Sequence, residues 1–304
     1  MRQPVAKHKR MIVVQLRGGL GNQMFQYAFG KCLATKNNTS LSLDTSFLQS
    51  KLPFKKWATQ MQYELHIFDV QADLKKNLFT SNLFLYPIAK TEHLIRTKLI
   101  ERKFSLLTET DFGCSAEFLT AGDNRYLIGN FQSEQYFKEI ESQIRKDFTF
   151  KASLNTTNSQ WAENIKNCNS VSIHIRRGDY ISINRNAKKF AAIPIKYYSD
   201  AVEIMAKKIS QPVFFLFSDD IKWAKENIQV DYPVHFVQNN TNSAGDDMRL
   251  MSYCKHHIIA NSTYSWWGAW LNGNPDKIVI APSKWFEDSS INSKDIYPSE
   301  WIKL

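Results

Sequence analysis

Two adjacent arginines, Arg176 and Arg177, directly follow an apolar run and have the most distinctive chemistry in the chain. The run "SVSIHI" (170–175) has the length and β-branched content of a strand. Arginine is always charged, and its planar guanidinium can bind two phosphate oxygens at once. Because ligands of parallel α/β sheets bind at the carboxyl ends of the strands, the pair predicts a diphosphate site. His174 is expected near the exit of the strand, and Gly178 would let the backbone approach a ligand closely.

The same residues allow two other interpretations. An arginine–aspartate surface turn would explain Arg177 and Asp179 without any ligand. The triplet "RGD" (177–179) also matches an integrin-binding motif. It follows a strand that should be buried, and not an exposed loop tip, so the integrin interpretation is not favoured.

A glycine-rich turn, "RGGLGNQ" (17–23), precedes a helical pattern near the start of the chain. It is neither a Walker A loop nor a GxGxxG fingerprint, because Met24 stands where a third glycine would follow Gly19 and Gly21. Backbone N–H groups at such a helix start can bind an anion or a sugar hydroxyl. A tight turn without a ligand is the alternative.

A second polar helix start lies in "ANSTYSWWGAW" (260–270). Asn261, Ser262 and Thr263 fall between a predicted strand and a predicted helix, where hydroxyl and N–H groups form a phosphate cradle. The three tryptophans that follow recur at helical spacing, and we expect them to pack in the core and not to stack on a sugar: Trp266, Trp267 and Trp270.

Acidic pairs occur at Asp219-Asp220 and at Asp246-Asp247, but the sequence contains no DxD triplet. Its absence disfavours a nucleotide chelated through a metal. A carboxylate placed after a strand can accept hydrogen bonds from the N1–H and the amino group of guanine. The alternative is that each pair only complements a helix dipole. The four cysteines lack zinc spacing, so we expect free thiols and no metal site.

Strand and helix patterns alternate through both halves of the chain. Such alternation predicts parallel sheets with helices on both faces. In the first half we expect strands at 11–16, 39–44 and 125–131, and helices at 23–37, 91–107 and 133–148, the last capped by Ser133. In the second half we expect strands at 170–175, 212–218, 233–238, 257–260 and 277–282, and helices at 195–209, 219–228, 245–256 and 261–272.

The polar stretch "KASLNTTNSQ" (151–160) is the predicted linker between two domains, 1–150 and 151–304. Residues 1–10 are treated as a possible extension, because Met11 can itself serve as a start.

The 304 residues carry a net charge of +10, which favours anionic partners. A nucleic-acid-binding protein is disfavoured, because the basic residues are scattered and no RNP motif, helix-turn-helix or zinc spacing is present. No run approaches the roughly 20 apolar residues of a spanning helix. We therefore expect a cytoplasmic location, with peripheral membrane contact through basic patches as a further possibility.

Four motifs give the chain a resemblance to glycosyltransferase family 11, the α-1,2-fucosyltransferases, in its bacterial form. The resemblance runs from about Met11 to Trp285, and the motifs appear in order: "GGLGNQMFQYAFGK", "VSIHIRRGDY", "FFLFSDD" and "IIANSTYSWWGAWL". The resemblance implies a GT-B architecture, in which two Rossmann-like domains face each other across a cleft. The carboxyl-terminal domain would bind GDP-fucose, and the amino-terminal domain would meet an oligosaccharide acceptor.

The resemblance also implies roles for individual residues. Arg176 and Arg177 would hold the diphosphate, and His174 and Asp247 would contact the guanine or the ribose. The remaining donor contacts would come from the two helix starts: Asn261, Ser262, Thr263, Gly19, Gly21, Asn22 and Gln23.

The implied reaction transfers fucose from GDP-β-L-fucose to the 2-hydroxyl of a terminal β-galactoside, with inversion and without metal or cofactor. A fucosyltransferase of another linkage or acceptor class is the alternative. The α-1,6-fucosyltransferases carry a carboxylate several residues after their arginine pair, but "YISINRNAKK" (180–189) contains none. The base would be Asp179 or a residue of the amino-terminal domain, unless cation character makes a strong base unnecessary.

Overall fold

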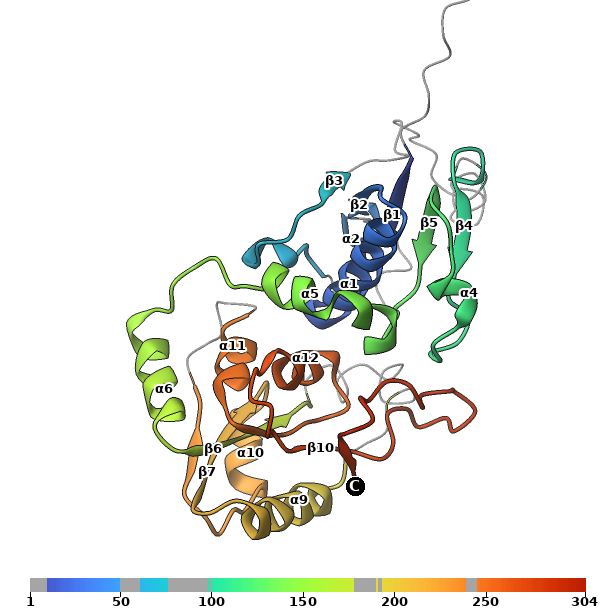
Figure 1. Ribbon diagram of the computed structural model, residues 1–304. Coiled ribbons are helices and arrows are strands. Elements are labelled where there is room, and N and C mark those ends of the chain that lie inside the picture. The colour runs from blue at the N-terminus through green and yellow to red at the C-terminus, as the bar shows by residue number, and fades with distance from the viewer. Residues whose placement is uncertain are drawn as a thin grey trace, which may run out of the picture.

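The chain forms two separate parallel sheets, one in each half (Figure 1). This computed structural model describes residues 10–49, 61–75, 98, 100–177, 190, 193–238 and 245–304. The strand order is β3-β2-β1-β5-β4 in the first sheet and β11-β10-β9-β6-β7-β8 in the second. Every pairing between these strands is parallel. The expected α/β class with two parallel sheets is confirmed.

The first sheet is built from five short strands. They are β1 (Met11–Gln15), β2 (Ser40–Asp44), β3 (Asp73–Lys75), β4 (Ser105–Thr108) and β5 (Arg125–Ile128). Ile12 and Val14 of β1 join the main core with helix α1, whereas Val13 points to a smaller cluster with Ile100 and Tyr126. This alternation places apolar side chains on both faces of β1, as a central strand requires.

Helix α1 (Leu20–Lys36) begins three residues earlier than the sequence pattern indicated. Gly18 has φ of +75°, and Gly19 then caps the helix in an extended conformation. The turn therefore takes only residues 17–19. Thirteen residues of α1 are buried, so the helix is enclosed on nearly every side by the first sheet and by the second half. This enclosure explains why its apolar pattern has no clear polar face.

The second sheet has six strands with helices on both faces. The strands are β6 (Asn169–Ile175), β7 (Pro212–Ser218), β8 (Val234–Phe236), β9 (His256–Ile258), β10 (Val279–Ala281) and β11 (Ile302–Lys303). Helices α9 (Ile195–Lys208) and α10 (Ile221–Asn227) cover one face. Helices α6 (Thr156–Lys166), α11 (Asp246–Tyr253) and α12 (Thr263–Leu271) cover the other, toward the first half.

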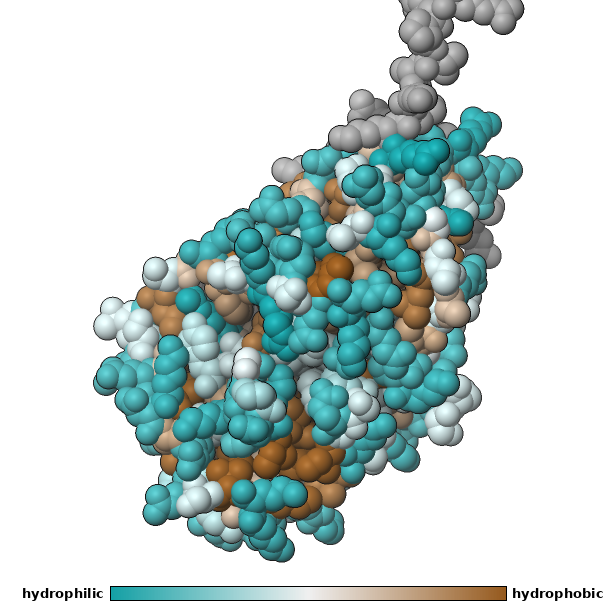
Figure 2. All heavy atoms as spheres, viewed as in Figure 1, coloured by the Kyte–Doolittle hydropathy of each residue, from teal (hydrophilic) through white to brown (hydrophobic). Residues whose placement is uncertain are grey.

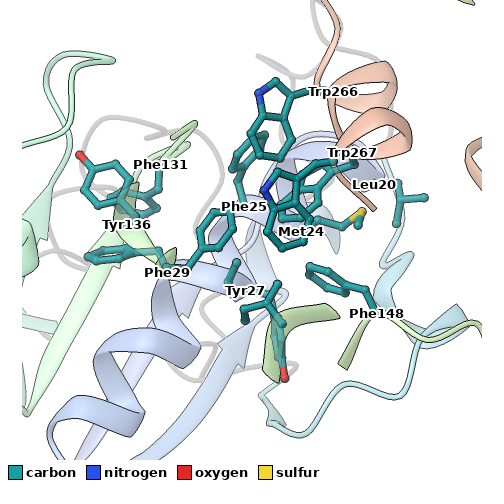
Figure 3. Close-up of a cluster of buried hydrophobic side chains, with 14 of the residues drawn as sticks. Leu20, Met24, Phe25, Tyr27, Phe29, Phe131, Tyr136, Phe148, Trp266 and Trp267 are labelled. Atoms are coloured by element: carbon teal, nitrogen blue, oxygen red, sulfur yellow. The ribbon is translucent and has the colours of Figure 1, made fainter. Parts of the chain in front are cut away.

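A single aromatic core joins the two halves (Figure 3). The ring of Phe25 lies 4.5 Å from Trp266 and 4.8 Å from Trp267. Phe137 of the first half stacks on Trp267 at 5.5 Å, and Trp270 is buried beside it. The tryptophans of α12 are core residues, as the sequence indicated.

Cations from both halves cap the carboxyl end of α12. Lys277 Nζ donates to the carbonyl oxygens of Ala269, at 3.0 Å, and Asn272, at 2.8 Å. Arg145 of the first half donates to the carbonyl of Trp270 at 2.8 Å. Burial lowers the pKa of Lys277 to about 8, with the charge of Arg145 acting in the same direction. Positive charge at this end also complements the helix dipole.

One expected helix is interrupted by tertiary packing. The segment 133–148 forms η3 (Glu134–Tyr136), η4 (Lys138–Ile140) and α5 (Glu141–Asp147). Phe137 between them has φ of −139° and inserts its ring beside Trp267. Ser133 does cap the first turn, since its Oγ accepts the N–H of Gln135 at 3.3 Å.

Two other expectations need correction. The predicted helix 91–107 is wrong at its end, because β4 begins at Ser105. The predicted linker 151–160 is helical from Thr156 onward, since Asn155 caps α6 through its side chain. Two short strands, β3 and β11, escaped the sequence patterns. The remaining short elements are α2 (Ser46–Gln49), η2 (Leu65–Ile67) and α4 (Ala116–Leu119).

The surface in Figure 2 is mainly hydrophilic, with apolar side chains gathered over the second half near α9 and α10. Within the described ranges, none of the helices has the length and apolar character to cross a membrane.

Candidate active site

The arginine pair lies at the carboxyl edge of the second sheet, directly after β6, where the sequence placed it. Arg176 Nη1 is 3.1 Å from Asp219 Oδ2, and Asp219 follows β7. The backbone N–H of Arg177 donates to Asp219 Oδ1 at 2.9 Å. The carboxylate of Asp219 therefore contacts both arginines, through an ion pair with the side chain of Arg176 and a hydrogen bond from the backbone of Arg177. Gly178 and Asp179 lie outside the described residues.

The two arginines differ in their surroundings. The guanidinium of Arg177 lies 3.5 Å from the centre of the Trp223 ring, and its Nε is 3.5 Å from Asp220 Oδ2. Asp220 also caps α10, accepting the N–H of Trp223 at 3.1 Å. Stacking and the ion pair fix Arg177 against α10, whereas Arg176 forms an ion pair with Asp219, the residue that follows β7. The two guanidinium groups are therefore oriented by different elements, and contact of either one with a phosphate stays a prediction.

His174 is a neutral histidine inside the sheet edge. It is 5% exposed, and burial lowers its pKa to about 3, with the charge of Arg176 acting in the same direction. Its Nδ1 has no hydrogen-bond partner among the residues that the structure describes. A neutral imidazole can donate or accept one hydrogen bond but supplies no charge. Contact with a neutral base or ribose suits it better than contact with phosphate.

Tyr264 connects His174 to the start of α11. Its ring lies 5.8 Å from that of His174, and its hydroxyl accepts the N–H of Met248 at 3.0 Å. Burial raises the pKa of Tyr264, and the charge of Asp247 raises it further, so Asp247 lies close to this phenol. The structure therefore brings His174 and Asp247 to the same tyrosine. The neighbouring Asp246 accepts the side-chain amide of Asn158 at 2.9 Å and supports the fold.

The residues at the start of α12 make contacts within the chain. The buried amide of Asn261 donates to the carbonyl of Trp285 at 3.0 Å. Ser262 Oγ caps α12 by accepting the N–H of Tyr264 at 3.3 Å. Thr263 contacts the glycine turn of the first half. Donor contacts by these three residues stay predictions.

The first turn of α1 and the start of α12 touch. A Cβ on Gly21 would lie 2.6 Å from the carbonyl carbon of Thr263 and 2.7 Å from its Oγ1. Trp267 Nε1 donates to the carbonyl of Gly21 at 2.9 Å. Gly21 is therefore required for the close approach of α1 and α12. The sequence around Gly21 does not reveal this requirement, because Thr263 is distant in the chain. Because both helices follow strands, the contact also brings the carboxyl edges of the two sheets together.

Asn22 and Gln23 bind other parts of the first half. Asn22 Oδ1 accepts the amide of Gln132 at 2.8 Å. Gln23 is fully buried, and its Nε2 donates to the carbonyls of Gly18, at 2.9 Å, and Gln62, at 2.7 Å. Its Oε1 accepts the N–H of Glu64 at 3.0 Å. Gln23 thus fixes the segment 62–64 over the turn, and a direct donor contact stays a prediction.

Sequence reasoning missed three charged residues of the first half. Arg17 follows β1 and stacks 5.0 Å from the Phe47 ring, and burial lowers its pKa. Glu109 follows β4, and burial raises its pKa. Glu64 lies over the glycine turn. Arg17 could have been found by the argument used for Arg176, since each directly follows a run that was predicted to be a strand. Glu64 has no such signal.

Within the described part of the chain, no group of three or more His, Cys, Asp and Glu side chains could hold a metal ion. All four cysteines are free.

Comparisons with known proteins agree on one family. The family model described as glycosyl transferase family 11 matches residues 2–304. An α-1,2-colitosyltransferase of Escherichia coli is 34% identical over 308 residues, covering 97% of this chain and 99% of that relative. The O-antigen biosynthesis glycosyltransferase WbnK of Escherichia coli is 35% identical over 309 residues, covering 95% and 99%. A mouse galactoside α-(1,2)-fucosyltransferase 1 is 26% identical, covering 87% and 64%.

Among solved structures, fucosyltransferase NodZ from Bradyrhizobium aligns with a TM-score of 0.47 at 14% identity, covering 86% of this chain and 92% of that one. The R284K mutant of Arabidopsis thaliana FUT1, in complex with GDP, aligns with a TM-score of 0.48 at 12% identity, covering 97% and 76%.

Proposed function

Because the chain belongs to glycosyl transferase family 11, we propose that it transfers L-fucose from GDP-β-L-fucose to the 2-hydroxyl of a terminal β-galactoside. The product is an α-1,2-fucoside, and the reaction inverts the anomeric centre. The observation that carries the proposal is the pair of arginines held by Asp219 at the carboxyl edge of β6, next to the neutral His174. The names of the bacterial and mouse relatives support the linkage.

Donor binding follows from the charges at this edge. The guanidinium of Arg176 binds the diphosphate, and the first turn of α12 adds backbone N–H groups and the positive end of its dipole. His174 and Asp247, on either side of Tyr264, contact the guanosine. A carboxylate accepts from guanine N1–H and its amino group, and a neutral imidazole hydrogen-bonds without repelling the base.

The transfer is a single displacement. The acceptor oxygen forms a bond to C1 of fucose on the face opposite the phosphate, while the electron pair of the C1–O bond passes to the β-phosphate oxygen. Charge develops on the departing GDP, and the permanent charge of Arg176 stabilises it. We propose that this guanidinium takes the part that a metal plays in other nucleotide-sugar transferases.

The acceptor lies on the side of the first half. Contact between α1 and α12 places the carboxyl edge of the first sheet against the donor residues. The relatives named for O-antigen biosynthesis and colitose transfer favour a glycan of the bacterial surface as the acceptor.

A second donor is favoured by one comparison. The relative that is 34% identical is named as a colitosyltransferase, and colitose is fucose without its 3-hydroxyl. The diphosphate and guanosine contacts proposed above serve both donors equally, so the sugar itself must be tested.

The test is a donor panel with the purified protein in EDTA and lactose as the acceptor, followed by nucleotide release and product mass. We expect GDP release from GDP-fucose together with an α-1,2-linked product. Transfer from GDP-colitose alone would support the proposed guanosine and diphosphate contacts but show that the donor sugar is colitose and not fucose. Release from a uridine-diphosphate sugar would overturn the guanosine contacts, and dependence on added Mg²⁺ would overturn the role given to Arg176.

A further inference from the structure

Glu64 lies over the glycine turn at the start of α1. A Cβ on Gly19 would lie 3.9 Å from Glu64 Oε2. The backbone N–H of Leu20, the first residue of α1, donates to the same carboxylate. The side chain of Glu64 is partly exposed. The carboxylate is therefore placed at the carboxyl edge of the first sheet and remains within reach of solvent.

Three hydrogen bonds of Gln23 tie the backbone that carries this carboxylate, at residues 62 and 64, to Gly18 of the glycine turn. The amide of Gln23 accepts the N–H of Glu64 and donates to the carbonyls of Gln62 and Gly18. Gln23 is fully buried, so its side chain cannot leave these partners without disturbing the core. The position of Glu64 is consequently fixed in advance, as a group that acts on a substrate requires.

The glycine turn under Glu64 leads directly into the part of α1 that touches the second half. The charge of Glu64 acts on Tyr264, whose ring lies 5.8 Å from His174. The contact of Gly21 with Thr263 brings the two helix starts together at the same place. A hydroxyl bound between the two sheet edges would meet Glu64 from the acceptor side.

Other buried carboxylates of the described first half are committed to the fold. Both oxygens of Glu109 accept backbone N–H groups of the loop after β5. Asp44 and Asp147 are almost fully buried, and each accepts a tyrosine hydroxyl. Glu134 accepts the indole N–H of Trp270, at the far end of α12. Among the described residues, Leu20 donates a hydrogen bond to the carboxylate of Glu64, and a carboxylate can accept more than one such bond, which leaves acceptor capacity for a ligand.

We propose that Glu64 is the general base that accepts the proton of the acceptor hydroxyl. The inference rests on the proposed function. As the acceptor oxygen bonds to C1 of fucose, its proton passes to the carboxylate of Glu64, and the electron pair of the C1–O bond leaves with GDP. The protonated carboxyl group then returns the proton to water.

The surroundings of Glu64 suit this role. Burial raises its pKa, while the Leu20 N–H and His66 lower it by a smaller amount. The pKa of Tyr264, a residue of α12, is raised mainly by burial and further by nearby carboxylates that include Glu64. A pKa brought toward the working pH makes a carboxylate a better proton acceptor while leaving it ionised.

The test is the pH dependence of kcat/KM for the wild type and for Glu64→Gln. In the wild type we expect an acid limb, because Glu64 must be ionised. In Glu64→Gln we expect kcat to fall by about 10²–10⁴-fold, with the limb gone and the GDP affinity retained. Glu109→Gln is the matched control, since it removes a half-buried carboxylate with a raised pKa. It should keep the acid limb.

Glu64→Asp provides a second variant should the glutamine variant fold poorly. It keeps a carboxylate at a shorter reach, so we expect an acid limb with a reduced kcat. Wild-type turnover in either variant, or an acid limb that persists in Glu64→Gln, would overturn the role of Glu64 alone. Loss of GDP affinity in step with loss of turnover would show a purely structural role and overturn it too. A wild type inactive with every donor would count against the proposed function as well.

Discussion

At the scale of single residues, two arginines that are adjacent in the sequence have different surroundings. Arg177 lies flat on Trp223 and is paired with Asp220, so its orientation comes from packing. Arg176 lies beside Asp219 and is the one proposed to stabilise the leaving GDP. The sequence predicted where the pair lies but could not separate the two roles, because the difference depends on α10, more than forty residues away.

Replacing Arg176 by alanine tests that division. Removing one preorganised donor to a developing anion costs about 3–4 kcal/mol of barrier, which is about 10²–10³-fold in kcat. We expect Arg176→Ala to lose this much turnover with little change in Tm. Arg177→Ala should instead lower Tm, because it removes the stacking on Trp223. The two variants are compared by steady-state kinetics and thermal unfolding, and near-normal turnover in Arg176→Ala would contradict its role.

The sequence predicted which polar residues lie at the ends of strands, but it did not predict which residues they contact. Arg176, Asp219 and His174 lie at the edge that their strands predicted. Gln23 was expected beside the donor, but its amide binds the backbone of residues 18, 62 and 64. Residues 62–64 carry no strand or helix pattern that would place them over the glycine turn. Only the folded chain shows this contact.

At the scale of elements, the strands predicted from apolar runs and, for residues 39–44, from alternating leucines match β1, β2, β6 and β7 closely. Each of these runs is long enough to be read locally. Strands β3 and β11 are two or three residues long and exist because a neighbouring strand pairs with them. The helix expected at 133–148 is broken because burying Phe137 against Trp267 outweighs helix continuity. In each of these cases the prediction failed because the element depends on contacts with residues that are distant in the sequence.

The contact between α1 and α12 gives a prediction at the same scale. Gly21→Ala would place a methyl group 2.6 Å from the backbone of Thr263. Overpacking of this kind costs about 1–3 kcal/mol, so we expect a lower urea midpoint and weaker GDP binding. The matched control is Gly273→Ala, because a Cβ there has no atom within 4 Å. Equal midpoints for the two variants would contradict the close approach.

At the scale of the whole molecule, two parallel sheets share one aromatic core. Alternating patterns predicted the two sheets, but they could not predict that α12 and α1 would join them. The cap of α12 shows the same union, since Arg145 comes from the first half and Lys277 from the second. Because both halves contribute side chains to the aromatic core and to the cap of α12, we expect the chain to unfold as one cooperative unit.

Buried histidines make the stability of this unit dependent on pH. The pKa of His174 is lowered to about 3, and burial holds the pKa of His257 well below its usual value. In the unfolded chain both titrate near 6.5, so between about pH 3 and 6.5 the unfolded state binds more protons. Stability should therefore fall as the pH drops below about 6.5. The check is the urea midpoint between pH 7.5 and 4.5.

The control for this prediction is His174→Asn, in which the unfolded state loses one of the titrating groups. Its midpoint should decline less steeply on acidification than that of the wild type. A wild-type midpoint that is flat down to pH 4.5 would mean that these histidines do not stay neutral in the folded protein.

The indole of Trp267 donating to Gly21 has a consequence for how substrates come and go. A hinge motion that separated α1 from α12 would break this bond and expose Phe25 and Trp267, at about 25 cal/mol for each Å² of apolar surface. The contact between α1 and α12 is therefore expected to stay intact. For the proposed reaction we therefore expect GDP to leave while α1 and α12 stay in contact, without separation of the two halves.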